Sequence, residues 1–225
     1  MARFKNNIEL GNGIYTVPDL ALILQLPQHK VRRWLAEFYD ERLGDVYQGK
    51  YSWGEGREKA TNFLTLIEFY VFYMLRQQKM SVSKIMDAHN HMCKALDTNY
   101  PFASYKLLVN KNDILYGIDE ETWVHANSTN QIVIHKIIAD FFKKIDFSAK
   151  DLAERFWPLG KNRRIVVDPH HQFGQPVIDG TNINAASIFS MYKSGEPTSI
   201  IGSLYDLSEQ QVKDAIAFCE RKAAA

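Results

Sequence analysis

The residues of this 225-residue chain best suited to a chemical task are basic side chains in the stretch Gln28–Tyr39. Apolar residues recur there at steps of three and four, as on the buried face of an amphipathic helix. The opposite face is polar, and its cations come early in the helix. Arginine in that position can bridge two acceptors on guanine or pair with phosphate. The pattern indicates a DNA-reading helix, with the solvated face of a small helical domain as the alternative. The candidate DNA contacts on this face are Gln28, His29, Lys30, Arg32 and Arg33.

The flanking sequence favours the DNA interpretation. A first helix is expected to open at Val17-Pro18-Asp19 and to stop at Leu26-Pro27, so the basic helix is the second of a helix-turn-helix pair. Two short runs follow, Val46-Tyr47 and Tyr51–Trp53, joined by Gly49-Lys50. They predict a β-hairpin that could lie on a phosphate backbone as a wing. The candidate contacts on this hairpin are Lys50, Arg57 and Lys59.

Other clusters could do chemistry, but their spacing argues against it. His89 and Cys93 lie one helical turn apart, yet no third metal ligand follows at a suitable spacing. The cluster Asp168-Pro169-His170-His171 would need a second acidic residue for hydrolysis, and there is no reason in the sequence to choose Asp179. We interpret it as a polar turn after a strand. No glycine-rich phosphate loop or nucleophile elbow is present. We therefore expect no metal, no cofactor and no catalytic residue, so that the protein is not an enzyme.

Composition describes an ordinary globular protein with a sizeable core. Hydrophobic residues make up 46% and charged residues 24% of the chain, and the net charge is +1, so a DNA-binding surface would have to be local. The two cysteines are far apart, which is typical of a reducing compartment. The N-terminus lacks a signal-peptide core, and the apolar run Phe63–Leu75 is too short to span a bilayer. We expect a cytoplasmic protein with no membrane association.

The pattern of elements predicts an α+β fold that is mainly helical. Helices are expected at Asn62–Lys79 and Ser83–Leu96, and the first is apolar nearly all round, so another domain or subunit should help to cover it. A β-rich segment with a hairpin around Asn110-Lys111-Asn112, a strand at Trp123–His125 and a turn at Ser128-Thr129-Asn130 should follow, then a helix at Ile132–Ile145. We expect three units: residues 1–97, a winged helix-turn-helix; residues 98–160, a β-rich middle segment with a helix; and residues 161–225.

The last unit is expected to begin with a strand at Arg163–Val167. Val177-Ile178 and Thr181–Ile183 could pair as a hairpin across Asp179-Gly180. Three helices should follow: one from Asn184 to Ser194, one from Pro197 to Tyr205, and one capped by Ser208 that ends at Cys219. This is a second helix-turn-helix-like pattern. The last helix could pack Val212, Ala215, Ile216 and Cys219 against a partner.

Roughly the first 97 residues resemble a known class of DNA-binding domain. The motif Val31-Arg32-Arg33-Trp34 in a second helix, followed by a wing and a helix pair, resembles the MerR-type winged helix-turn-helix. That resemblance implies DNA binding and a homodimer. No sustained heptad is present to form the long coiled coil through which MerR regulators usually dimerise.

The C-terminal block carries a denser motif: Asp168-Pro169, then Gly174-x-Pro176-x-Ile178-x-Gly180-Thr181, then Gly195, and finally Tyr205-x-Leu207-Ser208. It is similar to a small bacterial and archaeal family long known only as a domain of unknown function. Asn182 stands where arginine is more usual. Proteins of this family resemble antitoxins encoded beside PIN-type ribonuclease toxins. A longer subgroup, the VapB-type antitoxins with a MerR-like domain ahead of the block, has the layout of this chain.

The resemblance implies two tasks, namely blocking a PIN-type toxin by direct binding and repressing the shared operon by binding operator DNA. Basic residues suit the acidic cleft of such a nuclease. From Ile165 onward the chain has four basic against seven acidic side chains, so DNA binding is assigned to the N-terminal unit. The alternatives are an effector-responsive MerR-like transcription regulator with no toxin partner, whose middle segment is the ligand domain, and a purely structural adaptor. The candidate toxin contacts are Lys161, Arg163, Arg164, Arg221 and Lys222.

Overall fold

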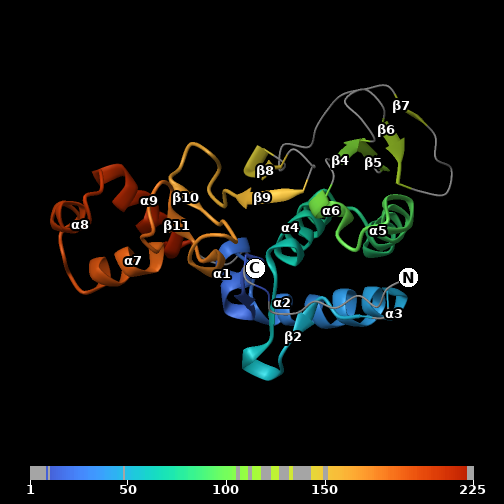
Figure 1. The fold of residues 1–225 in the computed structure, drawn as a ribbon, viewed down its shortest axis with the longest axis horizontal. Coiled ribbons are helices and arrows are strands. Elements are labelled where there is room, and N and C mark those ends of the chain that lie inside the picture. The colour runs from blue at the N-terminus through green and yellow to red at the C-terminus, as the bar shows by residue number, and fades with distance from the viewer. Residues whose placement is uncertain are drawn as a thin grey trace.

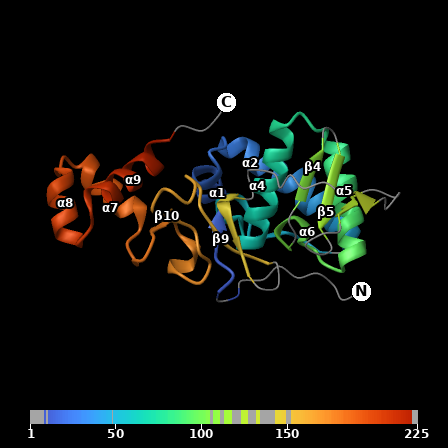
Figure 2. The ribbon, with the colours of Figure 1, turned by 90° about the horizontal axis from the view of Figure 1, so that it is seen from above.

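The fold is α+β and mainly helical, with four small antiparallel sheets among the residues described. The computed structural model describes residues 9, 11–47, 49–104, 107–110, 113–117, 123–126, 132–133, 143–148 and 152–221. The molecule is elongated, and its C-terminal helices form one end of the long axis in two perpendicular views (Figures 1 and 2). Within those residues, no helix has the length and apolar character needed to cross a membrane.

The two predicted N-terminal helices are present, and the first ends before Pro27 as its local signals indicate, while the second continues past its expected end near Tyr39. Strand β1 (Tyr15–Thr16) leads directly into α1 (Val17–Leu24). The Thr16 hydroxyl accepts from the Asp19 N–H, and the Asp19 carboxylate accepts from the Thr16 N–H at 2.9 Å, so both residues cap the helix. The chain then turns through Gln25 in the left-handed region, and α2 (Gln28–Trp34) begins after Pro27.

The predicted hairpin exists, but with different strands. Helix α2 continues without a break into η1 (Leu35–Leu43), which is wound as a π-helix, and then into α3 (Gly44–Tyr47). The prediction of a strand at Val46-Tyr47 was therefore wrong, because a two-residue run carries no period that separates strand from helix. The strands that do pair are β2 (Ser52–Trp53) and β3 (Ala60–Thr61), joined through the short turn η2 (Gly56–Glu58). Strand β3 also pairs with β1.

Helix α4 (Phe63–Gln77) forms the centre of the fold; it lies within the predicted range Asn62–Lys79 and is capped by Asn62. It packs on α6 (Pro101–Ser104) and beside α5 (Val82–Leu96), which is capped by Ser81. Aromatic rings from several other elements also cover it. The chain itself thus covers this apolar helix, so its composition alone does not call for a second subunit. The ring pairs are Trp34–Phe72 at 5.0 Å between centroids, Tyr39–Phe69 at 5.2 Å and Tyr70–Phe156 at 4.6 Å.

The described part of the middle segment contains more strand than predicted. Strands β4 (Leu107–Asn110), β5 (Asp113–Gly117), β6 (Trp123–His125) and β7 (Ile132–Val133) form one antiparallel sheet in that order. The pairing of Asn110 with Asp113 confirms the predicted hairpin. The expected turn at Ser128-Thr129-Asn130 lies outside the described residues.

The predicted helix at Ile132–Ile145 was wrong at its described start, while near its described end residues 143–144 form a 3-10 turn just before strand β8 (Ile145–Phe147). It begins in strand β7, and it ends where β8 pairs with β9 (Ala153–Phe156); its centre lies outside the described residues. The apolar residues at its ends instead belong to strands whose partners are separate segments. Apolar spacing does not reveal such a pairing.

The C-terminal unit contains the three predicted helices, α7 (Ala185–Lys193), α8 (Thr198–Tyr205) and α9 (Glu209–Glu220). Asn184 and Ser208 cap the first and the last. The expected hairpin needs correction: β11 (Val177–Ile178) pairs with β10 (Ile165–Val166). Thr181–Ile183 forms no strand with β11, but the Ile178 N–H donates to the Ile183 carbonyl at 2.9 Å and the Thr181 N–H donates to the Ile178 carbonyl at 3.0 Å.

The apolar face of α9 is used within the chain. Val212 and Ala215 are fully buried, Ile216 nearly so, and α9 packs mainly against α7. Cys219 packs half-buried against the same core and forms no disulfide. The expectation that this face meets a partner protein was therefore wrong.

One hydrophobic core runs from Tyr15 to Phe218. Phe156 and Val167 exchange two backbone hydrogen bonds of 2.9 and 2.8 Å, so an isolated bridge links the end of β9 to the residue after β10. Near the other end of the chain, the Ile14 N–H donates to the Phe173 carbonyl at 2.9 Å. These contacts cross the expected boundary at residue 161. The division into three units stays a prediction.

Candidate functional site

The basic face of α2 is held in place by the buried side of the same helix. Val31 is fully buried and Trp34 nearly so, which fixes the rotation of α2 on the core. Arg32 and Arg33 therefore point outward, and both are exposed. Within the described part of the chain, neither arginine forms an ion pair. Their guanidinium groups are available to an external ligand.

The other three candidates on this helix support the same surface. Gln28 and His29 are exposed in the first turn. Lys30 is half-buried, and its Nζ lies 5.4 Å from the centroid of the Trp34 ring, where a cation is favourably placed. The structure thus brings all five predicted residues of α2 onto one short helix, with the charge concentrated at Arg32 and Arg33.

The hairpin divides its basic residues between two roles. Lys50 and Arg57 are exposed, and the connection between β2 and β3 projects from the body of the molecule (Figure 1). Lys59 instead forms an ion pair with Asp40, with 2.6 Å between Nζ and Oδ2. Of the three predicted hairpin contacts, two are available and one holds the hairpin to the protein.

Asp40 is a positioning residue that the sequence interpretation missed. It is buried on the π-helix η1 and accepts hydrogen bonds from the Ser52 N–H at 3.0 Å and the Ser52 hydroxyl at 2.5 Å, besides the ion pair with Lys59. One carboxylate therefore ties both ends of the hairpin to the helix that continues α2. An aspartate directly after the predicted helix Gln28–Tyr39 was the available signal in the sequence, but its partners Ser52 and Lys59 come from another segment.

The candidate toxin contacts that precede β10 are engaged inside the molecule. Lys161 pairs with Asp146 at 2.5 Å, Arg163 with Asp214 at 2.7 Å, and Arg164 with Asp179 at 3.0 Å. Burial opposes ionisation of Asp146, but hydrogen bonds from Lys161 and Trp157 outweigh it and lower the pKa of this carboxyl. These three cations pair with carboxylates of the same chain and so help to stabilise the fold.

Asp214 is the most deeply buried of these acidic partners. It has no exposed surface, and it accepts from Arg163 at 2.7 Å, from the Arg164 N–H at 3.0 Å and from the Gln210 amide at 2.8 Å. Burial alone would raise the pKa of Asp214, but the hydrogen bonds from Arg163, Arg164 and Gln210 lower it below its ordinary value. This carboxylate anchors the start of β10 to α9.

Of the two candidates near the C-terminus, Arg221 is engaged in contacts within the chain. The Arg221 guanidinium lies 4.6 Å from the centroid of the Phe218 ring, and its Nε donates to the Phe218 carbonyl at 3.2 Å. Burial lowers the pKa of Arg221 to about 10. Lys222 lies outside the described residues.

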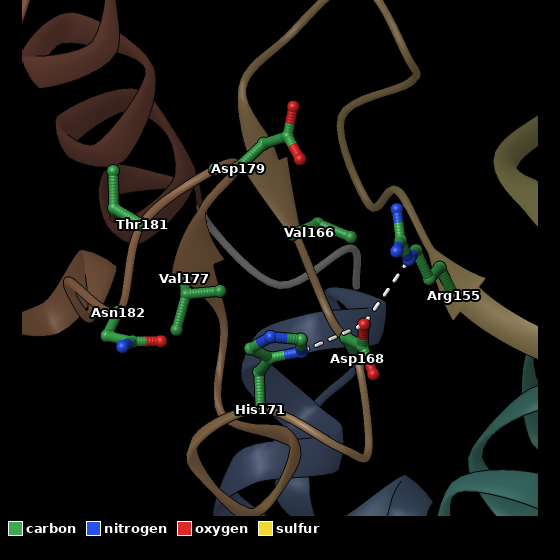
Figure 3. Close-up of a pocket in the computed structure, with 9 residues that line it drawn as sticks. Arg155, Val166, Asp168, His171, Val177, Asp179, Thr181 and Asn182 are labelled. Carbon is green, nitrogen blue, oxygen red and sulfur yellow. Dashed lines mark hydrogen bonds and ion pairs between the residues drawn. The ribbon is translucent and has the colours of Figure 1, made fainter.

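A polar pocket of about 340 Å³ opens between β9, β10 and the turn after β11 (Figure 3). Asp168 is buried at one end and accepts from the His170 N–H at 2.9 Å, while His171 Nδ1 and Arg155 Nε lie 3.1 and 3.3 Å from its Oδ2. As expected, the Asp168 cluster forms a polar turn after a strand. Asp179 also lines the pocket, a placement that no local pattern indicated.

The geometry of this pocket does not assemble a hydrolytic site. Asp179 lies at the opposite end from Asp168 and pairs with Arg164, so the two carboxylates do not converge on one point (Figure 3). The Thr181 hydroxyl donates to the Ile178 carbonyl at 2.8 Å. Nucleophilic catalysis needs a hydroxyl or thiol within reach of a base, and the lining residues do not provide that arrangement.

A second buried cluster joins α4 to α5 and α6. Glu68 is fully buried, and its carboxylate lies 2.9 Å from His89 Nε2 and accepts from the N–H groups of Phe102 and Ala103 at 2.8 and 3.1 Å. Cys93 Sγ lies 3.4 Å from His89 Nδ1. Burial alone would lower the pKa of His89, but the charge of Glu68, followed by the contacts with Cys93, raises it to about 10.

Both ring nitrogens of His89 are therefore occupied by protein partners. The imidazolium–carboxylate pair cross-links three helices in the core. Among the residues that the structure describes, no three His, Cys, Asp or Glu side chains are placed to hold a metal ion. The cluster acts as a structural link.

Comparisons with known proteins agree with this description of the chain. Residues 165–219 match a family described as a protein of unknown function, DUF433. The chain is 21% identical over 222 residues to the Mycobacterium tuberculosis (strain ATCC 25618 / H37Rv) protein named "Putative antitoxin VapB45", covering 90% of this chain and 92% of that protein. The crystal structure of Rv2018 from Mycobacterium tuberculosis superposes with a TM-score of 0.65 at 16% identity, over 95% of this chain and 99% of that one. The chain is thus similar to an antitoxin along most of its length, and it shares the fold of Rv2018.

Proposed function

We propose that this protein is the antitoxin of a type II toxin–antitoxin system, which neutralises a PIN-type ribonuclease by binding it directly and represses its own operon by binding operator DNA. The observation that carries the proposal is the extent of the similarity to VapB45, which spans 90% of this chain. The similarity therefore includes the N-terminal unit as well as the block at residues 165–219. The role is regulatory and non-enzymatic, and its place is the cytoplasm.

In this proposal α1 and α2 act as a MerR-like helix-turn-helix, and the β2–β3 hairpin acts as its wing. Arg32 and Arg33, which are exposed and form no ion pair with the described residues, would enter the major groove, while Lys50 and Arg57 would meet phosphate. Asp40 would set the angle between helix and wing through Ser52. A homodimer suits a two-fold symmetric operator.

Direct binding of the toxin is proposed for the C-terminal unit. Three of the basic residues first considered for this role are held in ion pairs, and each of these cations neutralises a buried or half-buried carboxylate. A partner that drew them away would leave those carboxylates uncompensated, at a cost in stability. Toxin binding through other surface residues of this unit is therefore favoured.

The proposal predicts a PIN-type reading frame adjacent to the gene of this chain, and the experiment that tests it is co-expression of the two. We expect growth to be restored, the two proteins to co-purify, and the purified complex to shift promoter DNA of the shared operon. A neighbour whose toxicity is not relieved, and which forms no complex, would sink the antitoxin proposal. Promoter binding that then responded to a small molecule would favour the effector-responsive MerR-like regulator, and binding of neither DNA nor nuclease would favour the structural adaptor.

A further inference from the structure

Helix α8 presents an apolar face to solvent. Ile200 is 52% exposed and Leu204 65% exposed, and these residues lie one helical turn apart on the same side of the helix. The opposite side of α8 is the one that packs into the protein, since Ile201 is fully buried and Gly202 is buried against the Leu207 carbonyl. The exposed pair therefore lies on a face that the fold itself does not use.

The surroundings of this face are typical of an interaction surface. Thr198–Tyr205 contains no charged residue, and Ser199 and Ser203 beside the apolar pair are small and exposed. Helix α8 also lies at the far end of the long axis in both views, so no described segment shields it (Figures 1 and 2). Single exposed apolar residues are common, but a charge-free helix with two of them side by side is better explained as a contact surface.

An acidic residue lies beside each end of α8. Glu196 precedes the helix and Asp206 follows it; both are exposed, and neither forms an ion pair within the described chain. Asp206 stands at the C-terminal cap, where a negative charge is unfavourable to the helix dipole. The charge of Asp206 therefore does not serve the stability of α8 and is available to complement a basic partner.

These charges argue against a second copy of this chain as the occupant. In a two-fold contact between antiparallel copies of α8, Glu196 of one copy would approach Asp206 of the other. Like charges brought together at an interface are unfavourable. An apolar centre with an acidic residue at each end instead complements a surface with an apolar depression bordered by lysine or arginine.

We propose that α8 is the central anchor of a docking surface for a partner protein with this apolar and basic character. Resting on the proposed function, we assign that partner as the PIN-type nuclease. Two side chains are too few for a whole interface, which covers about 800 Å² on each partner. They fit the small central group of residues that dominates binding, surrounded by a polar rim.

The test uses the full-length chain, a catalytically inactive form of the adjacent nuclease, and isothermal titration calorimetry. Ile200→Ser combined with Leu204→Ser is expected to lower the affinity about 100-fold, since truncation of each central anchor commonly weakens binding about tenfold or more. Both residues are exposed, so the variant should keep the melting temperature and the operator binding of the parent. The matched control is Phe173→Ser, because Phe173 is a 62% exposed apolar residue in the loop before β11; its affinity for the nuclease should not change.

A second double variant, Glu196→Lys combined with Asp206→Lys, reverses the two charges beside α8. Affinity for the nuclease should fall about tenfold at low salt, and less as the salt concentration rises, because screening removes the interaction. If the parent chain does not bind the nuclease at all, the proposed function fails. If the parent binds but the Ile200 and Leu204 variant binds equally well, the docking inference fails while the function stands. Sedimentation that shows the variant to lose a dimer while keeping nuclease affinity would also overturn it.

Discussion

Two regions of this molecule use similar pairs of arginines in opposite ways. On α2, Arg32 and Arg33 are exposed and form no ion pair within the described residues. Before β10, Arg163 and Arg164 are also half-exposed or more, but each is held by an aspartate. The first pair is available to an external ligand, and the second pair is part of the internal structure.

This difference shows what a count of charges in a sequence leaves out. The carboxylates that hold Arg163 and Arg164 lie 51 and 15 residues away along the chain, and they meet these arginines only in the folded state. A pair of adjacent arginines therefore looks the same in the sequence at both places. The tertiary structure decides which pair can bind a partner.

The largest expected effect separates the two pairs by their part in DNA binding. Arg32→Ala combined with Arg33→Ala should lower the affinity for operator DNA about 1,000-fold, because each base contact of this kind contributes ~1–3 kcal/mol. The slope of log affinity against log salt should also become shallower, by about 0.9 for each phosphate that is no longer neutralised. Fluorescence anisotropy with labelled promoter DNA measures both.

The matched control removes two arginine charges from the region before β10. Arg163→Ala combined with Arg164→Ala should leave DNA affinity nearly unchanged while it lowers stability. If instead the two double variants lose DNA binding to the same extent, the assignment of DNA contact to α2 is wrong. If only the Arg163 and Arg164 double variant loses DNA binding, the roles of the two regions are reversed.

An intermediate effect concerns the buried ion pair between His89 and Glu68 and the dependence of its contribution to stability on pH. The folded-state pKa of His89, about 10, is above its ordinary value. The stabilisation by Glu68 is therefore complete below about pH 6.5 and is lost as pH rises toward 10, by an amount on the order of 4 kcal/mol. Urea unfolding between pH 6 and pH 9.5 should show this decline. His89→Gln is the control, and an equal decline in that variant would show that His89 is not its source.

The smallest expected effect concerns the internal pair in the C-terminal unit. Arg163→Ala should lower the free energy of unfolding at pH 7 by about 1–2 kcal/mol, because buried Asp214 loses one of its three donors. The pKa of Asp214 is lowered in the folded state, so the stabilisation is present above the ordinary pKa of aspartate and disappears as pH falls through the folded-state value. Parent and variant should therefore converge in acid.

Lys213→Ala is the matched control for that measurement. It breaks the ion pair with Glu209 on the exposed face of α9, where solvent screens the interaction. No measurable change in stability is expected. A loss as large as that of Arg163→Ala would show that exposure does not distinguish the two pairs.

Local signals allowed most helices to be predicted from the sequence. Asn184 and Ser208 begin α7 and α9 as expected, and Pro27 separates α1 from α2. The basic face of α2 followed from the spacing of Val31 and Trp34, since both the helix and its buried side are set by neighbours in the sequence.

Features that depend on distant partners could not be predicted in the same way. The pairing of β11 with β10 and the extension of α2 into a π-helix leave no local pattern. The same holds for Asp40, Asp179 and Asp214, whose roles come from residues 12 to 51 positions away. The candidate site was thus predictable where it lies on one helix, and not where it depends on contacts between segments.

The contact between Tyr15 and Gly174 bears on how such a chain could have been assembled in evolution. Gly174 has a φ of +84°, and a Cβ there would overlap the hydroxyl of Tyr15, so the glycine of the C-terminal motif also makes room for the N-terminal strand. Phe156, which lies outside the matched range, forms an isolated β-bridge with Val167 of the same block. If the block was once joined to the N-terminal unit by gene fusion, these two contacts would have to be replaced before recombination could separate them again. In this chain, the block at residues 165–219 is joined to the rest of the fold by contacts with residues outside its matched range.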